Sequence, residues 1–265
     1  MSETQKSKPM KKLILVMFLM PMLALAQNED EYRIFETANL VPKSGEVEAL
    51  EAGLKAHNQK YHSSGDFGAR VYWIANGRNT GTYHWSMGSL PWSAFDNPTW
   101  DEAEHTSDWN KNVQAHITPW SGDQSYWKFE AALSQFPKDF TLKNLYATYY
   151  DVKRGEWEKA MALVKKVTDV YHDKSPNEIY GIYSNEMPST KEGRDLVMIS
   201  FFEKSSWMGE DHSIKTKYEE VHGAGSFKVF IKEWIEVTIG SETEIWIFRP
   251  DLSGISGDVK GAPKK

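Results

Sequence analysis

Two segments near opposite ends of the chain carry the same pattern, and this repetition constrains the fold more than any other feature. The segment WKFEAAL occupies 127–133 and WIFRPDL occupies 246–252. Upstream of them, 41–76 aligns with 152–186 with one single-residue gap, and both copies contain a helical stripe that ends in a Tyr-His pair. The stripe is Val47, Leu50, Leu54, His57 and Tyr61 in the first copy, and Trp157, Ala160, Val164, Val167 and Tyr171 in the second. Similarity over this length indicates that one structural unit is present twice.

Each copy is predicted to contain a strand, a helix, two strands, a second helix and a final strand. The strand segments are rich in aromatic and β-branched residues, and the first helix of each copy has apolar residues spaced three and four apart. The predicted elements cover 32–40, 47–61, 69–77, 81–90, 101–117 and 127–133 in the first copy, and 144–152, 157–172, 178–187, 194–203, 214–237 and 246–252 in the second. The glycines in GAG at 223–225 are expected to break or kink the last helix. The order β-α-β-β-α-β is that of the ferredoxin-like unit, so the predicted class is α+β with two tandem ferredoxin-like units.

The strands of the second copy indicate how the two units pack. A sheet with one wet face alternates apolar and polar residues, but LVMISFF at 196–202 and IWIF at 245–248 are almost continuously apolar. Both faces of these strands are therefore expected to be covered. Helices cover one face, and we expect the sheet of the other copy to pack face to face against the second.

This element order and duplication resemble the dimeric α+β barrel superfamily, with two units fused in one chain as a pseudo-dimeric barrel. The resemblance covers approximately 32–252 and carries no catalytic motif. It implies a broad range of activities: cofactor-free monooxygenases, haem-degrading and haem-peroxidising enzymes, isomerases of small organic acids, and members without known activity. It also implies that a ligand lies between sheet and helices or inside the barrel.

The N-terminal segment is typical of a secretory signal. Four lysines precede the apolar run 13–25, which ends in a small-x-small sequence before Gln27. The predicted division is therefore a signal peptide at 1–26, a first unit at 27–138, a second unit at 139–252 and a flexible tail at 253–265. The mature chain is expected to be extracytoplasmic, either periplasmic or secreted, and to have no membrane contact after cleavage.

Composition narrows the chemistry. The chain has no cysteine, which excludes thiol catalysis and thiolate metal sites. Its net charge is −6, and it has no basic cluster, so we expect no nucleic-acid partner. No signature of a serine hydrolase, a P-loop, a dinucleotide-binding loop or a zinc protease is present.

The most promising site residues lie in TYHWSMGSLPWSAF at 82–95. On a strand, Thr82, His84 and Ser86 face one way, and Tyr83, Trp85 and Met87 face the other. His84 is the candidate catalytic acid/base, and the candidate ligand-binding residues are Tyr72, Trp73, Trp85 and Tyr183, the last being the counterpart of Trp73. The alternative is that His84 is a hydrogen-bonded histidine of the sheet with no catalytic role.

Two further histidine patterns have structural explanations. His57 lies on the apolar stripe and is interpreted as a satisfied core histidine. Glu102 and His105 have the Glu-x-x-His spacing of some metal sites, and so do Glu219 and His222, but the two helices are expected on opposite outer surfaces and cannot share an ion. No metal ligand set and no cofactor are therefore predicted, and nothing singles out a haem ligand among the eight histidines.

The sequence thus leaves three functions open. The first is an exported protein that binds a small apolar or aromatic molecule in or beside the barrel. The second is a cofactor-independent monooxygenase or isomerase with a histidine acid/base, and the third is a structural or partner-binding protein. The chain is expected to be a monomer or a homodimer.

Overall fold

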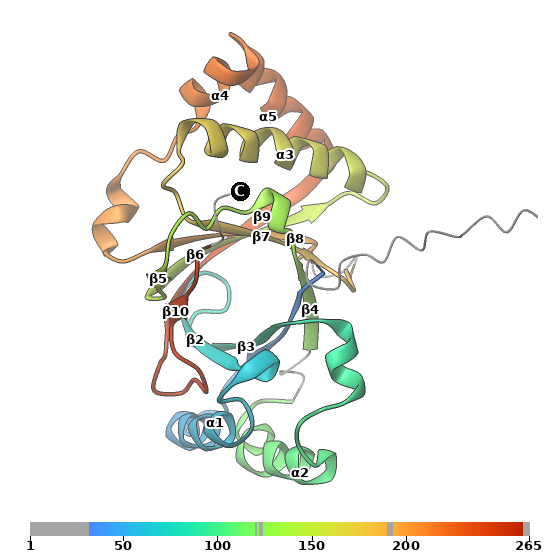
Figure 1. The fold of residues 1–265 in the computed structure, drawn as a ribbon, viewed down its shortest axis with the longest axis vertical. Helices are drawn as coiled ribbons and strands as arrows, with labels where there is room; N and C mark the ends of the chain where they lie inside the picture. Colours follow the sequence, from blue (N-terminus) through green and yellow to red (C-terminus); the bar gives the residue numbers. More distant parts are fainter. Residues whose placement is uncertain (1–31, 120, 122–123, 190–192, 262–265) are drawn as a thin grey trace, which may run out of the picture.

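Eight strands close into one antiparallel barrel, which lies between two groups of helices (Figure 1). The computed structural model describes residues 32–119, 121, 124–189 and 193–261, so the expected signal peptide lies outside the described residues. The strand order around the barrel is β1-β3-β2-β9-β6-β8-β7-β4. These strands are β1 (Ile34–Leu40), β2 (Ala69–Asn76), β3 (Tyr83–Leu90), β4 (Gln124–Phe129), β6 (Asn144–Val152), β7 (Tyr180–Asn185), β8 (Leu196–Phe202) and β9 (Thr238–Phe248).

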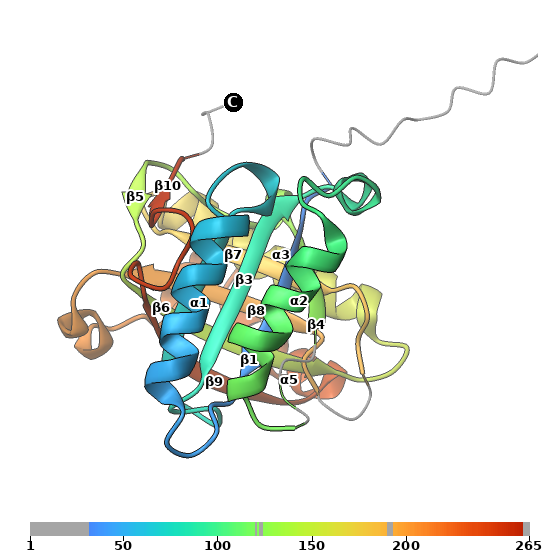
Figure 2. The same ribbon diagram turned by 90° about the horizontal axis from the view of Figure 1, so that it is seen from below.

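The helices cover opposite outer sides of this barrel. On one side, α1 (Val47–Tyr61) and α2 (Glu102–Asn112) lie next to each other over β1 and β3 (Figure 2). On the other side are α3 (Trp157–Lys174), α4 (Lys215–His222) and α5 (Ser226–Val237). The predicted break in the last helical region is confirmed, because Gly223 and Gly225 both adopt positive φ angles between α4 and α5. In the described part of the chain, no helix is long and apolar enough to cross a membrane.

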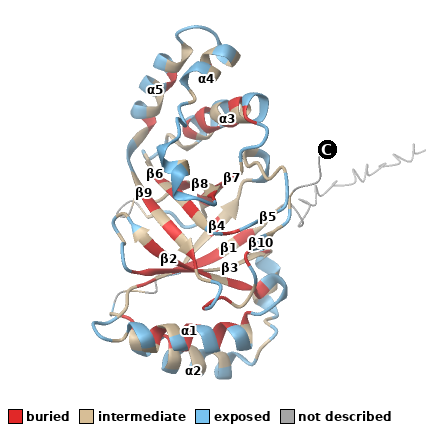
Figure 3. Cartoon of the chain, turned by 90° about the vertical axis from the view of Figure 1, so that its left-hand side faces the viewer, coloured by how far each residue is buried: buried red, intermediate tan, exposed pale blue. Residues whose placement is uncertain are grey.

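Apolar residues are buried on both sides of the barrel wall (Figure 3). The interior is filled mainly by inward-facing side chains such as Trp127, Tyr149 and Trp246. The outward-facing residues pack under the helices in separate clusters. Strand β8 shows why its sequence is so apolar: Val197 and Ile199 face the interior, whereas Leu196 packs under the helices.

The predicted α+β class is confirmed, but the strands are not arranged as two stacked sheets. Strand β2 pairs with β9, and β4 pairs with β7, so the strands of the two halves are hydrogen-bonded into a single ring. This closure satisfies backbone groups that two separate sheets would leave unpaired at their edges. The final strand of each copy was predicted at 127–133 and 246–252. The corresponding strands, β4 and β9, begin earlier and end earlier, at Phe129 and Phe248.

The chain after Leu252 differs from the flexible tail expected at 253–265. In its described part, 253–261, the Ser253 hydroxyl accepts a hydrogen bond from the backbone of Val71, and Gly254 N donates to Ala69 O. Further on, β10 (Asp258–Val259) pairs with β5 (Phe140–Thr141). The small residues permit this close approach, since a Cβ on Gly254 would lie 2.0 Å from the carbonyl oxygen of His62.

Candidate functional site

The structure divides the residues predicted as a site between the two faces of the barrel wall. His84 lies directly opposite Tyr72 in the β2–β3 register, and both side chains line a small interior cavity together with Tyr183. Trp73 and Trp85 belong instead to the apolar cluster beneath α1 and α2. The predicted alternation on β3 is therefore correct. It divides the five predicted site residues into an interior group of three and an outer group of two.

The interior group has little free space around it. The ring of His84 stacks on Trp246 with centroids 4.1 Å apart, and the cavity beside them measures about 70 Å³. Ligand pockets for small organic molecules are usually larger, at ~300 Å³ or more. Burial, and secondly the charge of Arg194, lower the pKa of His84 to about 3, so this imidazole is neutral at ordinary pH. A catalytic role for His84 stays a prediction, and the interior has no room for a substrate beside it.

A larger cavity lies on the outer side of the barrel, between α2 and strands β1, β3 and β4. Its volume is about 460 Å³, which is within the usual range for small-molecule sites. The lining is mostly apolar, with six Phe, Trp and Tyr side chains, and contains a few polar groups. It consists of Glu36, Ala38, His62, Phe67, Trp85, Met87, Phe95, Pro98, Trp100, Glu102, His105, Thr106, Trp109, Gln124 and Tyr126. We call this cavity the outer pocket.

Glu36 is the buried acid of the outer pocket. It lies on β1 between Phe35 and Thr37, whose side chains face the barrel interior, so Glu36 faces outward. The residue is only 6% exposed, and Gln124 Nε2 donates a hydrogen bond of 2.6 Å to Glu36 Oε1. Burial raises the pKa of Glu36 from 4.5 to about 7. A carboxyl group of this pKa can both take and give a proton near neutral pH.

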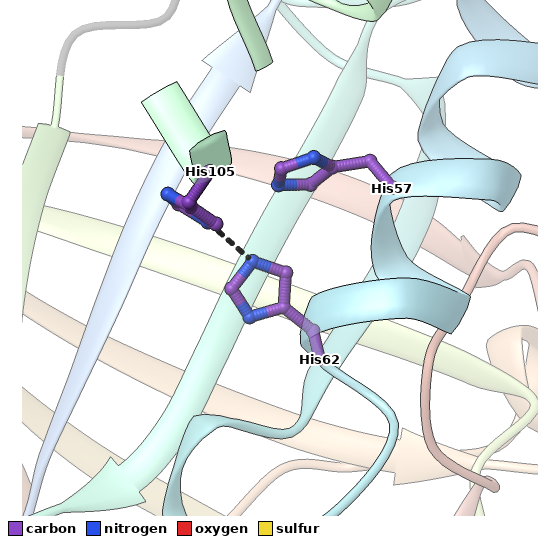
Figure 4. Close-up of side chains that lie close together, drawn as sticks. All are labelled: His57, His62 and His105. Atoms are coloured by element: carbon purple, nitrogen blue, oxygen red, sulfur yellow. Dashed lines mark hydrogen bonds between the residues drawn. The ribbon is translucent and has the colours of Figure 1, made fainter. Parts of the chain in front are cut away.

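Three histidines meet at the side of the outer pocket nearest α1. His57 is on α1, His62 immediately follows that helix, and His105 is on α2; their rings point toward one another in Figure 4. One nitrogen from each ring can be chosen so that all three atoms lie within 4.8 Å of one another. The Nε2 atoms of His62 and His105 are 3.3 Å apart. His62 and His105 line the pocket, whereas His57 lies behind them.

The other nitrogens of two of these rings have defined partners. His57 Nδ1 is 2.7 Å from Asp108 Oδ1, and His62 Nδ1 is 2.9 Å from the carbonyl oxygen of Phe67. Both acceptors require a proton on Nδ1, so each neutral ring carries its lone pair on Nε2. Within the described residues, His57 Nε2 is buried and has no hydrogen-bond partner. Burial is the largest cause that lowers the pKa of all three histidines, that of His62 to about 3.

Close packing of α1 against α2 brings these histidines together. A Cβ added to Gly53 would lie 1.7 Å from Asn112 O, so glycine is needed where the C-terminal end of α2 crosses α1. Asn58 then fixes the orientation of α1. Its amide donates to Leu252 O at 2.7 Å, and its carbonyl oxygen accepts from Trp85 Nε1 at 2.9 Å. The candidate ligand residue Trp85 therefore lines the outer pocket and also holds α1 in place.

The sequence patterns identified parts of this site but not the whole. His57 is a core histidine as interpreted, but only its Nδ1 is satisfied. The structure brings together His57, His62 and His105, a grouping that no sequence pattern indicated, and the absence of a metal ligand set stays a prediction. Glu102 lies outside the group of three histidines, and its carboxylate accepts a hydrogen bond from Trp100 Nε1. Glu36 had no sequence signal beyond being the one charged residue of strand β1.

Neither a family model nor a curated protein matches this sequence. Solved structures with the same fold do match. A candidate monooxygenase from Fusobacterium nucleatum has a TM-score of 0.53 at 11% identity, with 88% of this chain and 98% of that chain covered. A candidate monooxygenase from Lactobacillus acidophilus has a TM-score of 0.49 at 13% identity, covering 88% and 100% of the two chains. A chlorite dismutase variant from Candidatus Nitrospira defluvii has a TM-score of 0.49 at 11% identity, covering 83% and 92%.

At these identities the comparisons describe the fold and not the activity. The closed eight-stranded barrel with helices on two outer sides agrees with them. The chain therefore has the fold of the dimeric α+β barrel superfamily.

Proposed function

We propose that this protein is an enzyme that binds a small, largely aromatic molecule in the outer pocket and uses Glu36 to move a proton on it. The observation that carries this proposal is the placement of a buried carboxyl group, held by Gln124, in the wall of a 460 Å³ cavity with aromatic sides. A pocket of mostly apolar lining with a few placed polar groups is the usual arrangement for recognition of a small organic ligand.

The reaction class follows from the acid. The ionised form of Glu36 can remove a proton from a carbon next to a carbonyl group, or from a phenolic oxygen, and the resulting anion keeps the bonding electrons. Return of the proton to another carbon completes an isomerisation. Addition of molecular oxygen to the same anion is the corresponding first step of an oxygenase. The aromatic walls, including Trp85 and Trp109, exclude water and orient a flat substrate.

The acid/base residue of the proposed enzyme is Glu36 and not His84. The reaction class, a monooxygenase or isomerase without a cofactor, is the second function that the sequence left open. The structure from Fusobacterium nucleatum, which has the same fold, is described as a candidate monooxygenase, and this is compatible with proton removal from an aromatic substrate. Among the three alternatives, simple binding requires only the pocket, whereas enzymatic proton transfer also gives a reason for the buried acid.

Three further parts of the proposal concern the chain as a whole. We propose that 1–26 directs export to the periplasm or the outside of the cell. The repeated element order supports a description of the barrel as two fused ferredoxin-like units, 27–138 and 139–252. The partner is a small molecule and not a nucleic acid, and one chain completes the barrel, so a monomer or a homodimer is expected.

The experiment uses 1-tetralone, a two-ring ketone whose α-hydrogens exchange with solvent when a base removes them. Binding is measured by quenching of tryptophan fluorescence, and exchange is measured by NMR in heavy water. We expect the wild-type protein to bind the ketone and to accelerate its exchange. Glu36→Gln should keep the binding and lower the catalysed rate by ~10²–10⁴-fold, the usual contribution of a general base.

The matched control is Glu130→Gln, a half-buried carboxylate that accepts a hydrogen bond from Ser184 and does not line the outer pocket. It should leave the exchange rate unchanged. A Glu36→Gln protein with the wild-type rate would refute the catalytic role. Absence of saturable quenching in the wild type would refute aromatic binding at the outer pocket.

A further inference from the structure

The three histidines beside the outer pocket meet the requirements of a metal site. His57 is on α1, His62 directly follows that helix and His105 is on the neighbouring α2, so the donors approach from different directions (Figure 4). Neutral imidazole is a ligand for zinc, copper, iron and nickel, and a set of three histidines with one open position is the donor set of some catalytic zinc sites. Rings that were only packed together would not need their nitrogens to converge.

We propose that His57, His62 and His105 bind one divalent transition-metal ion, with zinc as the expected occupant, at the wall of the outer pocket. The ligand atoms are the Nε2 atoms. In His57 and His62 the Nδ1 atoms are already engaged by Asp108 and by the Phe67 carbonyl, so only Nε2 can face an ion. Such outer partners, a carboxylate or a backbone carbonyl on the other ring nitrogen, are typical of metal-binding histidines.

The distances agree with an ion that draws the rings slightly inward. Two nitrogens bound to zinc at ~2.0–2.1 Å in a tetrahedral arrangement lie ~3.3 Å apart. The Nε2 atoms of His62 and His105 have this separation of 3.3 Å. Without an ion, this contact is accounted for by a hydrogen bond from His105 to His62. That explanation leaves the buried Nε2 of His57 without a partner among the described residues, whereas a bound ion accounts for all three nitrogens.

The open coordination position faces the pocket. His62 and His105 line the cavity and His57 does not, so an ion held by all three has protein behind it and the cavity in front. In this respect the inference rests on the proposed use of the outer pocket. An oxygen atom of a phenolic or carbonyl substrate could then occupy the fourth position, where the ion would favour its anionic form. The substrate class thereby narrows to aromatic molecules that carry such an oxygen.

The experiment measures zinc binding to the full chain after removal of metals with a chelator. Zinc alone is the probe, followed by native mass spectrometry and competition with a chromogenic chelator. We expect one zinc ion per chain. His62→Ala and His105→Ala should weaken the affinity by more than ~100-fold, and Asp108→Asn, which changes only the outer partner, by ~10–100-fold. Cobalt should give the visible absorption bands of a four-coordinate site.

The second half of the chain supplies matched controls. His172 aligns with His62, and His222 has the corresponding place to His105 in the second helical region. Both are outside the three-histidine cluster, and His222 contacts Lys166 O instead. His172→Ala and His222→Ala should leave zinc affinity unchanged. Because loss of a buried histidine can unfold the protein, His57→Val is included: valine occupies the aligned position 167, and circular dichroism then verifies folding.

The two proposals can fail separately. A wild-type chain that binds no zinc, or binds it equally well in the His62→Ala and His105→Ala variants, overturns the metal site. Binding of 1-tetralone by the metal-free protein would still support the outer pocket. Conversely, stoichiometric zinc binding that requires the three histidines, in a protein that binds no aromatic probe, supports the metal site and refutes the proposed function.

Discussion

The two outer sides of the barrel carry aligned helices, yet only one of them holds the buried acid and the histidine cluster. We call the side under α1 and α2 the first outer face, and the side under α3, α4 and α5 the second outer face (Figure 1). On the second outer face, Val167 aligns with His57, and the second helical region continues into α5. There, Phe230 and Trp234 of α5 pack toward α3 and fill the interface with aromatic rings.

The difference begins with the covering helix. Helix α2 has 11 residues and none of them is buried, so it does not pack tightly on the strands. The space between α2 and the strands is the outer pocket. The second outer face also has a cavity, of about 320 Å³, but the strand residues that line it from β6 are Tyr146, Thr148 and Tyr150, and the acids at its rim are exposed. A buried carboxyl group in the barrel wall is therefore the property that separates the two faces chemically.

The largest expected effect is the dependence of stability on the charge of Glu36. Its pKa is about 7 in the folded protein and 4.5 in the unfolded chain, so unfolding between these values releases a proton. Stability therefore falls as pH rises from 4.5 to 7, and the penalty persists above 7. One unit of difference between the two pKa values corresponds to ~1.4 kcal/mol. The free energy of unfolding of Glu36→Gln should thus gain up to ~3 kcal/mol over wild type between pH 4.5 and pH 8.

Urea denaturation of both proteins across this pH range provides the measurement. The other titratable groups that line the outer pocket are His62, His105, Glu102 and Tyr126, and all are present in both proteins. Comparing the two proteins at each pH cancels their contributions. A difference between the proteins that is constant from pH 4.5 to pH 8 would show that Glu36 is not a buried acid, and the contrast between the faces would lose its chemical basis.

The next effect concerns the approach of α2 to α1. Gly53 aligns with Leu163 of α3, which is buried in the second outer face. The Cβ introduced by Gly53→Ala would lie 1.7 Å from Asn112 O, so the helices must separate. Overpacking of this kind costs ~1–3 kcal/mol. We expect a lower free energy of unfolding together with weaker zinc binding, since His57 and His105 move apart.

Leu163→Ala provides the control for that variant. It should also destabilise the protein, by ~2–5 kcal/mol from the cavity that it leaves, but it should not change zinc affinity. If both variants lower zinc affinity alike, the effect follows from general loss of stability. The position of α2 would then have no special role in the site.

The sequence predicted the elements of the fold because each depends on a local pattern. The helical stripes and the strand alternation at His84 and Trp85 follow the period of a single element, and the glycine break before α5 is a local feature. The structure confirms all three. Closure of the barrel could not be predicted from such local patterns, because it depends on pairing between β2 and β9, which are far apart in the chain. The small volume beside His84 in the barrel interior, about 70 Å³, could not be predicted either, because sequence patterns do not encode cavity volume.

The candidate site was difficult to predict for a different reason. His57, His62 and His105 do not form a motif in sequence, and they meet only because Gly53 permits two helices to touch. Glu36 acquires its raised pKa from the cover provided by the surrounding chain, far from its own neighbours in sequence. The alignment of the two copies did contain a signal, since His57 stands on the buried stripe of its helix where the second copy has Val167.

The smallest expected effect tests whether the first outer face needs the link between Trp85 and α1. In Trp85→Phe the donor to Asn58 Oδ1 is lost, and a buried oxygen is left without its partner. The cost of such a loss is ~1–3 kcal/mol, and we expect the lower end because the ring still packs. Trp73→Phe is the control, since Trp73 is only partly buried in the same cluster. Thermal unfolding should show a lower midpoint for Trp85→Phe than for Trp73→Phe. Equal midpoints would mean that Asn58 holds α1 through Leu252 alone, and the aromatic wall would then serve only the ligand.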